Sequence, residues 1–218
     1  MKLLTGIVAA TLTSVVALAS ANAADMYSGP AGPGGYKDGP AYVGVNWSGL
    51  YVGVNGGYGW SANTDYLDPT GVFGGGQIGY NFQRGNIVFG LETDFQGSGI
   101  SDSGWGDKSS LDWFGSVRGR AGYAFDRALV YATGGFGYGQ VTNNGFSETQ
   151  TGWVVGAGVE YKITPVWSAK AEYQYFDLDA PYNSPVGPLG YGSGDRTQFS
   201  TIRAGVNYFV GGVYEPLK

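Results

Sequence analysis

Eight stretches of the chain alternate large apolar residues with small or polar ones at a period of two. In the clearest, Trp47–Trp60 (WSGLYVGVNGGYGW), Val52 and Val54 share one parity while Gly53 and Asn55 share the other. Successive side chains of a strand point to opposite faces of a sheet, so each stretch predicts a strand with one apolar face. The predicted strands cover residues 47–60, 72–82, 87–96, 111–125, 128–141, 151–162, 167–176 and 198–210.

The connectors between these strands alternate in length. Residues 83–86, 126–127 and 163–166 form short connectors, whereas 61–71, 97–110, 142–150 and 177–197 form long ones. Each strand is long enough to cross a bilayer, which takes about 9–11 tilted residues. Short periplasmic turns and long outer loops are typical of bacterial outer-membrane barrels. The pattern therefore predicts an all-β fold, an eight-stranded antiparallel up-and-down transmembrane barrel over residues 47–210.

Large residues on the apolar parity are expected to face lipid. Aromatic residues gather near the strand ends, where the two membrane interfaces would lie. These interface aromatics are Trp47, Trp60, Trp113, Tyr123, Trp153, Tyr161, Trp167 and Tyr208. Leu111 is expected on the same outer face. The stretch 128–141 is ambiguous, since Leu129 and Tyr131 fall on one parity and Phe136 and Tyr138 on the other, which predicts a bulge near Gly134-Gly135.

The N-terminal segment resembles an export signal. Lys2 precedes an apolar run, and Ala21-Asn22-Ala23 offers a small-x-small site, so residues 1–23 predict a signal peptide cleaved after Ala23. Residues 24–46 are rich in Pro and Gly and predict a flexible periplasmic arm. Residues 211–218 form a short C-terminal tail, in which Glu215-Pro216 does not suit a strand ladder.

Composition narrows the chemistry. The chain holds 41 Gly among 218 residues, 13% charged residues and a formal net charge of −5. An acidic balance argues against nucleic acid as a partner. The sequence contains no Cys and no His. Disulfides, thiol chemistry, Ser-His-Asp triads and most zinc sites are thereby removed, so we expect no enzyme, cofactor or metal centre.

Charged residues within the strands fall almost entirely on the inward parity. They are Glu92, Asp94, Arg118, Arg120, Glu160, Lys170, Glu172 and Arg203. A lumen of eight strands is only wide enough for its own side chains, and buried charges need partners. We therefore expect a network of salt bridges that fills the lumen, with Glu92 and Asp94 facing Arg118 and Arg120. The alternative hypothesis is a conduction path or gate. Acid–base catalysis by the two carboxylates is disfavoured by the arginines opposite them.

Other motifs carry less information. Gly74-x-Gly76-x-x-Gly79 matches a dinucleotide fingerprint by letter, but it lies inside a predicted strand with no following helix. The long loops are polar and include Asp102, Asp107 and residues 177–197. They are either solvated connectors or a contact surface, because loops on rigid scaffolds often carry function. A calcium site at Asp177 and Asp179 is a weaker hypothesis.

Several blocks, among them GGQIGYNFQRGNIVFGLETDFQGS, LDWFGSVRGRAGYAFDRALVYATGGFGYG and TGWVVGAGVEYKITPVWSAKAEYQYFDL, closely resemble the small RopB-like "porin family" proteins of alphaproteobacteria. These belong to the OmpA/opacity-type eight-stranded barrels. The resemblance implies a monomeric outer-membrane barrel for envelope integrity and surface contact. Its implied partners are outer-membrane lipid, lipopolysaccharide, the barrel-assembly machinery and a host surface. One departure is that Phe209, in place of a terminal aromatic residue, is followed by Val210 and the tail.

Three alternatives stay open at this point. The first is a narrow ion or solute channel. The second is a surface binder of a ligand or host molecule, with haem held by loop tyrosines as one example. The third concerns the fold, a soluble lipocalin-like barrel in the periplasm, which would place its aromatic residues inside.

Overall fold

The computed structural model describes residues 45–61, 69–104, 107–143, 145–179 and 196–210, without the side chains of 102–104 and 107–108. The predicted signal peptide, nearly all of the predicted arm, the tail and most of the loops 61–71 and 177–197 lie outside these residues. In the described part, no helix is long and apolar enough to cross a membrane.

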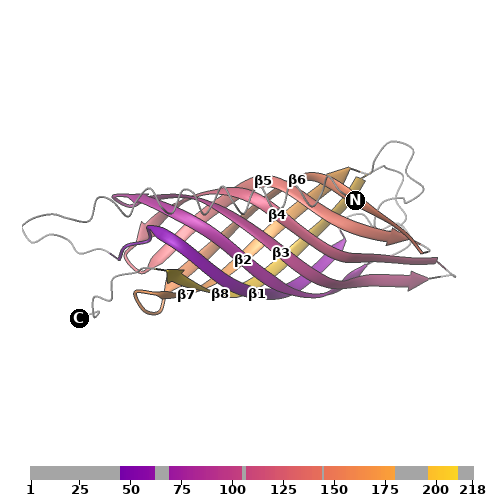
Figure 1. Cartoon of the computed structure of the whole chain (residues 1–218), viewed down its shortest axis with the longest axis horizontal. Coiled ribbons are helices and arrows are strands. Elements are labelled where there is room, and N and C mark those ends of the chain that lie inside the picture. The colour runs from indigo at the N-terminus through magenta and orange to yellow at the C-terminus, as the bar shows by residue number, and fades with distance from the viewer. Residues whose placement is uncertain (1–44, 62–68, 105–106, 144, 180–195, 211–218) are drawn as a thin grey trace, which may run out of the picture. The chain divides into compact units, whose positions relative to one another are not determined.

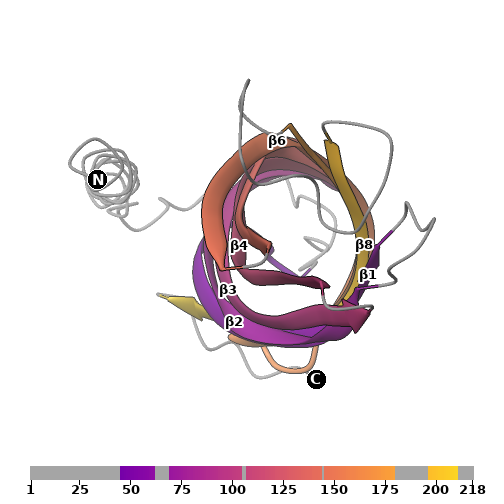
Figure 2. The ribbon, with the colours of Figure 1, turned by 90° about the vertical axis from the view of Figure 1, so that its right-hand side faces the viewer.

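Eight antiparallel strands close into a barrel (Figure 1). They are β1 Gly49–Ser61, β2 Thr70–Arg84, β3 Ile87–Gly104, β4 Asp107–Phe125, β5 Ala128–Asn143, β6 Phe146–Lys162, β7 Trp167–Asp179 and β8 Arg196–Val210. Each strand pairs with its neighbours in sequence, and β8 pairs with β1, with Val54 opposite Val206. Figure 2 shows the closed ring from the end that carries the long connectors. The predicted eight-stranded up-and-down barrel is confirmed.

The short connectors lie where the sequence predicts them. The strands that meet there begin at Ile87, Ala128 and Trp167, as predicted. Two of the turns use left-handed backbone, at Gly85 (φ 61°) and Asp126 (φ 56°). Gly adopts this region freely, and Asp is one of the few other residues that tolerate it. We call this end of the barrel the short-turn end.

At the opposite, long-loop end the strands run further than predicted. β3 and β4 contain 18 and 19 residues, against about 9–11 for one bilayer crossing. They reach furthest at the right of Figure 1. The added segments are rich in Ser, Asp and Thr, so their hydrophobic pattern fades although the backbone ladder continues. Hairpin pairing needs only backbone hydrogen bonds, which explains why these ends were missed.

The outer wall of the barrel is apolar. Every strand exposes large hydrophobic side chains, for example Val54, Val72, Leu91, Phe125, Val130, Val155, Tyr173 and Ile202. Seven of the eight predicted interface aromatics, Trp60, Trp113, Tyr123, Trp153, Tyr161, Trp167 and Tyr208, are half-buried or exposed on this wall. Lipid would cover this apolar outer wall, whereas in water the same surface would remain exposed to solvent.

Trp47, the eighth predicted interface aromatic, is a correction. Its side chain is 0% exposed and lies inside the short-turn end of the barrel. Trp47 precedes β1, so strand alternation does not fix the direction of its side chain. Its indole Nε1 instead donates to the carbonyl oxygen of Asp126, at 3.2 Å.

Leu111 also faces the lumen, contrary to prediction. The register between β4 and β5 shifts between Leu111 and Trp113, which leaves Asp112 as an extra residue. A bulge of this kind reverses the parity of every residue beyond it. Leu111 is therefore fully buried, while Trp113 keeps its outward position.

The bulge expected at Gly134-Gly135 is absent from the described β5, because its register with β4 and β6 is continuous there. Leu129 and Tyr131 simply point inward, and Phe136 points outward. The prediction was wrong because it assigned all large residues to the lipid face.

Candidate functional site

The lumen is filled by three layers of side chains. At the short-turn end lies the short-turn cluster, formed by Trp47, Tyr51, Val88, Ala124, Leu129, Tyr131 and Phe209. At the other end lies the long-loop cluster, formed by Phe73, Ile100, Leu111, Phe114, Val141, Val154, Phe176, Leu178 and Phe199. Between them is the charged layer, which consists of Glu92, Asp94, Arg118, Arg120, Glu160, Lys170, Glu172 and Arg203. The structure thus places all eight charged residues singled out from the sequence together in the lumen.

The charged layer contains four acids and four bases, each at most 4% exposed. They come from β3, β4, β6, β7 and β8, where they occupy the inward parity. Charges removed from water this completely are tolerated only when they are paired and hydrogen-bonded. The equal numbers of acids and bases allow each charge in this layer a partner of opposite sign.

Glu92 lies within salt-bridge distance of all four bases of this layer. Its carboxylate oxygens are 2.6 Å from Arg118 Nη2 and 2.8 Å from Lys170 Nζ. Arg203 and Arg120 lie further away, at 3.5 and 3.9 Å. The predicted pairing of Glu92 with Arg118 across the β3–β4 hairpin is therefore seen directly, since these two residues are also opposite in register.

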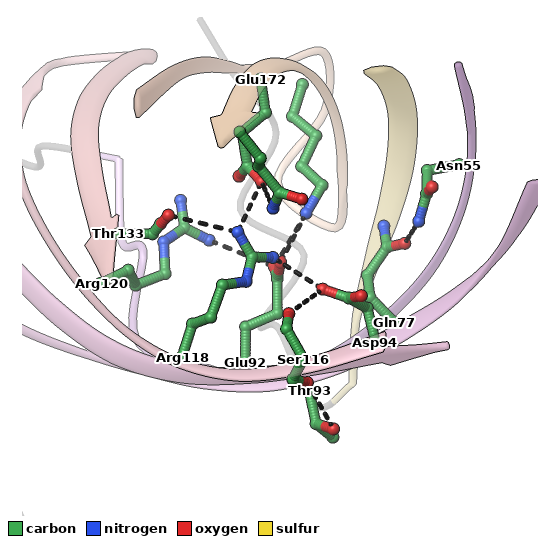
Figure 3. Close-up of polar contacts among 12 residues, drawn as sticks. Asn55, Gln77, Glu92, Thr93, Asp94, Ser116, Arg118, Arg120, Thr133 and Glu172 are labelled. Atoms are coloured by element: carbon green, nitrogen blue, oxygen red, sulfur yellow. Dashed lines mark hydrogen bonds and ion pairs between the residues drawn. The ribbon is translucent and has the colours of Figure 1, made fainter. Parts of the chain in front are cut away.

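On the side of the charged layer that faces the long loops, two arginines each contact both Asp94 and Glu172. Arg118 contacts Asp94 Oδ2 at 2.8 Å and Glu172 Oε1 at 2.6 Å. Arg203 contacts the same Glu172 oxygen at 2.6 Å and Asp94 Oδ2 at 3.4 Å. Figure 3 shows Arg118 lying between Glu92, Asp94 and Glu172. Each carboxylate is thereby shared between cations, which forms one connected network.

Arg120 does not pair mainly with the hairpin partners predicted for it. Its Nη2 lies 2.7 Å from Glu160 Oε2, on β6 across the lumen. Its guanidinium carbon lies 4.0 Å from the centroid of the Tyr131 ring. Glu160 also accepts hydrogen bonds from Ser168 and Asn207. Arg120 therefore anchors a second, smaller part of the network nearer the short turns.

Two inward tyrosines connect the charged layer to the short-turn cluster, and sequence reasoning did not assign them a role. The hydroxyl of Tyr51 donates to Glu92 at 2.8 Å and accepts from Arg120 at 3.1 Å. The hydroxyl of Tyr131 donates to Glu172 at 2.7 Å. Their inward parity could have revealed them, because a buried tyrosine hydroxyl needs a polar partner.

Each of these tyrosines lies opposite a glycine. Tyr51 pairs in register with Gly79, and Tyr131 pairs with Gly158. A Cβ atom at Gly79 would lie 2.4 Å from the Tyr51 hydroxyl, and one at Gly158 would lie 2.7 Å from the Tyr131 hydroxyl. The last glycine of the fingerprint-like motif is thus required by packing inside a strand.

Trp47 closes the short-turn end. Its backbone N–H donates to Gln83 Oε1 at 2.7 Å, so the residue is held by the β2–β3 and β4–β5 turns together. Its ring meets Phe209 edge-on, with centroids 6.3 Å apart. Lys162 Nζ lies 3.3 Å from the Phe209 ring centroid and donates to the carbonyl of Pro165. No pattern in the sequence marks this contact, because it joins segments that are far apart along the chain.

Four phenylalanines form the centre of the long-loop cluster. Phe114 contacts Phe73, Phe176 and Phe199 at centroid distances of 5.1, 5.5 and 5.4 Å. Phe176 and Phe199 stack at 4.6 Å. Aromatic pairs in these geometries add to the stability gained by burial alone. Apolar side chains therefore pack at both ends of the lumen, with ion pairs between them.

The weaker chemical hypotheses gain no support. Among the described residues, no group of three or more carboxylates is placed to hold a metal ion. Asp177 and Asp179 instead lie 3.4 and 2.9 Å from nitrogens of Arg196. The side chains of Asp102 and Asp107 lie outside the described part.

Comparison with known proteins decides the family. Residues 8–209 match the model of the outer membrane protein beta-barrel domain. The chain belongs to this family. The 31 kDa outer-membrane immunogenic protein of Brucella melitensis biotype 1 is 36% identical over 202 residues, which cover 75% of this chain and 83% of the relative. The 22 kDa outer membrane protein of Rhizobium leguminosarum bv. viciae is 36% identical over 151 residues, covering 66% and 70%.

A further relative agrees with this assignment. The 25 kDa outer-membrane immunogenic protein of Brucella canis is 31% identical over 199 residues, which cover 87% of this chain and 91% of the relative. Among solved structures, Neisserial surface protein A has 18% identity and a TM-score of 0.49, with coverage of 74% of this chain and 97% of that chain. The family and the named outer-membrane relatives place this β-barrel protein in the outer membrane, as the sequence predicts.

Proposed function

We propose that this outer-membrane barrel is a structural, non-conducting component of the envelope, with its long-loop end as a contact surface. The observation that carries the proposal is the filling of the lumen. Two apolar clusters flank a charged layer of four acids and four bases. A carboxylate held by cations on several sides is poorly suited to act as an acid or base, which also supports a non-catalytic role.

The narrow channel remains the competing function, and the layered lumen argues against it. An ion entering the barrel would have to displace the phenylalanines around Phe114 or the packing around Trp47 before it reached the charged layer. Dry apolar constrictions block ions because an ion loses its hydration there.

Planar-bilayer conductance tests the closed lumen. Folded protein is added to the bilayer, with heat-modifiable gel mobility as the control that the barrel is intact. We expect no unit conductance. Reproducible unit currents that change in Glu92→Gln or Arg118→Gln variants would show that ions cross the charged layer, and the channel would replace the proposed function.

The contact surface is proposed from the long strands and from the relatives. β3 and β4 extend beyond the length that one bilayer crossing needs. The two Brucella relatives are named as immunogenic proteins, which supports exposure of the corresponding end to the outside. Outer-membrane lipid, lipopolysaccharide, the assembly machinery and a host surface are the proposed partners of a monomer.

Surface exposure can be measured on intact cells. An epitope tag inserted in the β5–β6 connector at Gly145 should bind antibody without permeabilisation, whereas a tag at Gly85 in the β2–β3 turn should not. Both glycines have positive φ and open space where a side chain would be. Labelling of the Gly85 tag alone would reverse the proposed orientation.

A further inference from the structure

A group of buried polar atoms without protein partners lies on the lumen wall formed by β1, β2 and β3. Asn55, Gly75 and Gln96 follow one another across these strands in register. Gln96 is 0% exposed, and neither its Oε1 nor its Nε2 has a hydrogen-bond partner among the described residues. Asn55 Oδ1 and Asp94 Oδ1 likewise have no hydrogen-bond partner among the described residues.

Gly75, which has no side chain, lies between Asn55 and Gln96 on this wall. A Cβ atom at Gly75 would lie 2.5 Å from Gln96 Oε1, so the glutamine amide extends over this glycine. Neighbouring strands are about 4.8 Å apart, which places Asn55 and Gln96 about two strand spacings from each other. Asp94 is the next inward residue along β3, and its other oxygen is already held by Ser116, Arg118 and Arg203.

Leaving such groups unpaired is costly. More than 90% of buried polar groups in native proteins have a protein or water partner. Each buried donor or acceptor without one loses its hydration with no compensation. We therefore expect these four atoms to have a partner other than the protein chain.

The chemistry of the four atoms identifies that partner. Gln96 Nε2 needs an acceptor, whereas Gln96 Oε1, Asn55 Oδ1 and Asp94 Oδ1 need donors. A cation would satisfy only the oxygens and would lie near Arg118 and Arg203, which contact Asp94. An anion would satisfy only the nitrogen and would meet the Asp94 carboxylate. Water supplies both donors and acceptors.

We propose that Asn55, Asp94 and Gln96 form a buried water-binding site between the charged layer and the long-loop cluster. The site continues into a chain of protein hydrogen bonds. Asn55 donates to Gln77, Gln77 donates to Asn207 at 2.7 Å, and Asn207 donates to Glu160 at 2.8 Å. Figure 3 shows Asn55 and Gln77 joined beside Asp94. The bound water thus hydrates the upper charged layer and ends a polar chain that reaches Glu160.

Replacement of Gln96 by methionine tests the site, because bound water and a dry site predict opposite changes in the folding equilibrium constant. Methionine keeps the length of the side chain and removes both polar atoms. If water holds the amide, Gln96→Met loses these hydrogen bonds, and we expect the folding equilibrium constant to fall by about tenfold. If the amide is dry and unpaired, the same change removes a penalty, and the constant rises.

Gln77→Met is the matched control on the same wall. Both polar groups of Gln77 are paired with protein, to Asn55 and Asn207, so its replacement should destabilise the barrel with or without bound water. A high-resolution crystal structure of the unmodified protein gives a second readout that does not depend on a variant folding. We expect ordered water within hydrogen-bond distance of Gln96 Nε2 and Asp94 Oδ1.

Two results would overturn the proposal. One is a rise in stability in Gln96→Met, and the other is a crystal structure in which Gln96 bonds directly to protein with no solvent beside it. The inference rests on the closed lumen of the proposed function, but the two fail in different experiments. An open lumen would appear as unit conductance of the wild-type barrel, whereas a dry site would appear as a silent barrel stabilised by Gln96→Met.

Discussion

Neutralising Glu92 should be among the most damaging single changes in the lumen. The carboxylate lies 2.6 to 3.9 Å from nitrogens of four bases and accepts a hydrogen bond from Tyr51 at 2.8 Å. Glu92→Gln keeps the shape of the side chain but leaves three acids facing four bases in a buried layer. Removing one partner of a buried ion pair typically lowers the free energy of unfolding by about 3–5 kcal/mol, and we expect a loss in this range for Glu92→Gln.

A compensating change separates charge balance from simple loss of contacts. Both carboxylate contacts of Lys170, at 2.8 and 2.9 Å, are made with Glu92. Lys170→Met alone should also be costly, because it leaves one acid in excess. The double variant Glu92→Gln/Lys170→Met restores three acids and three bases, so its cost should be smaller than the sum of the two by about 2 kcal/mol.

The assay is equilibrium unfolding by urea of the barrel in phospholipid bilayers, followed by gel mobility and tryptophan fluorescence. The control is Asp179→Asn, which breaks an exposed pair with Arg196 and should cost less than about 1 kcal/mol. The reasoning is refuted if Glu92→Gln is as stable as wild type. Strict additivity in the double variant would refute the charge-balance argument on its own.

Three further changes test the packing of the lumen. Gly79→Ala should lower the free energy of unfolding by about 1–3 kcal/mol, because its Cβ would lie 2.4 Å from Tyr51. Its control is Gly74→Ala on the same strand, where the nearest contact is 3.6 Å and the expected change is less than about 0.5 kcal/mol. Equal effects of the two variants would contradict this argument. Trp47→Ala should cost about 3–5 kcal/mol in the same assay, since it empties the short-turn end, and a near-neutral result would show that Trp47 is not packed there. Phe114→Ala should cost a similar amount yet remain silent in the bilayer, because the charged layer still blocks the lumen; unit current in this variant would place the barrier in the long-loop cluster alone.

Much of the site follows from parity along the strands. Glu160, Lys170 and Arg203 could each be assigned to the lumen from the residues on either side of them, because strand geometry leaves only two faces. The apolar residues that face inward were harder, since Leu129 and Tyr131 look locally like lipid-facing positions. Only when the strand is paired with its neighbours does the inward set become continuous.

The sequence by itself determines the class of fold, its membrane and its lipid-facing wall. A period of two and alternating connector lengths are local properties, and few architectures other than a closed barrel satisfy them in lipid. The partners across the lumen are decided by the tertiary structure. Arg120 meets Glu160 at 2.7 Å, and Trp47 meets the carbonyl of Asp126 at 3.2 Å. These contacts depend on the stagger of the strands, which no local pattern specifies. Parity fixes the face on which a side chain lies, and only closure of the barrel fixes what it touches.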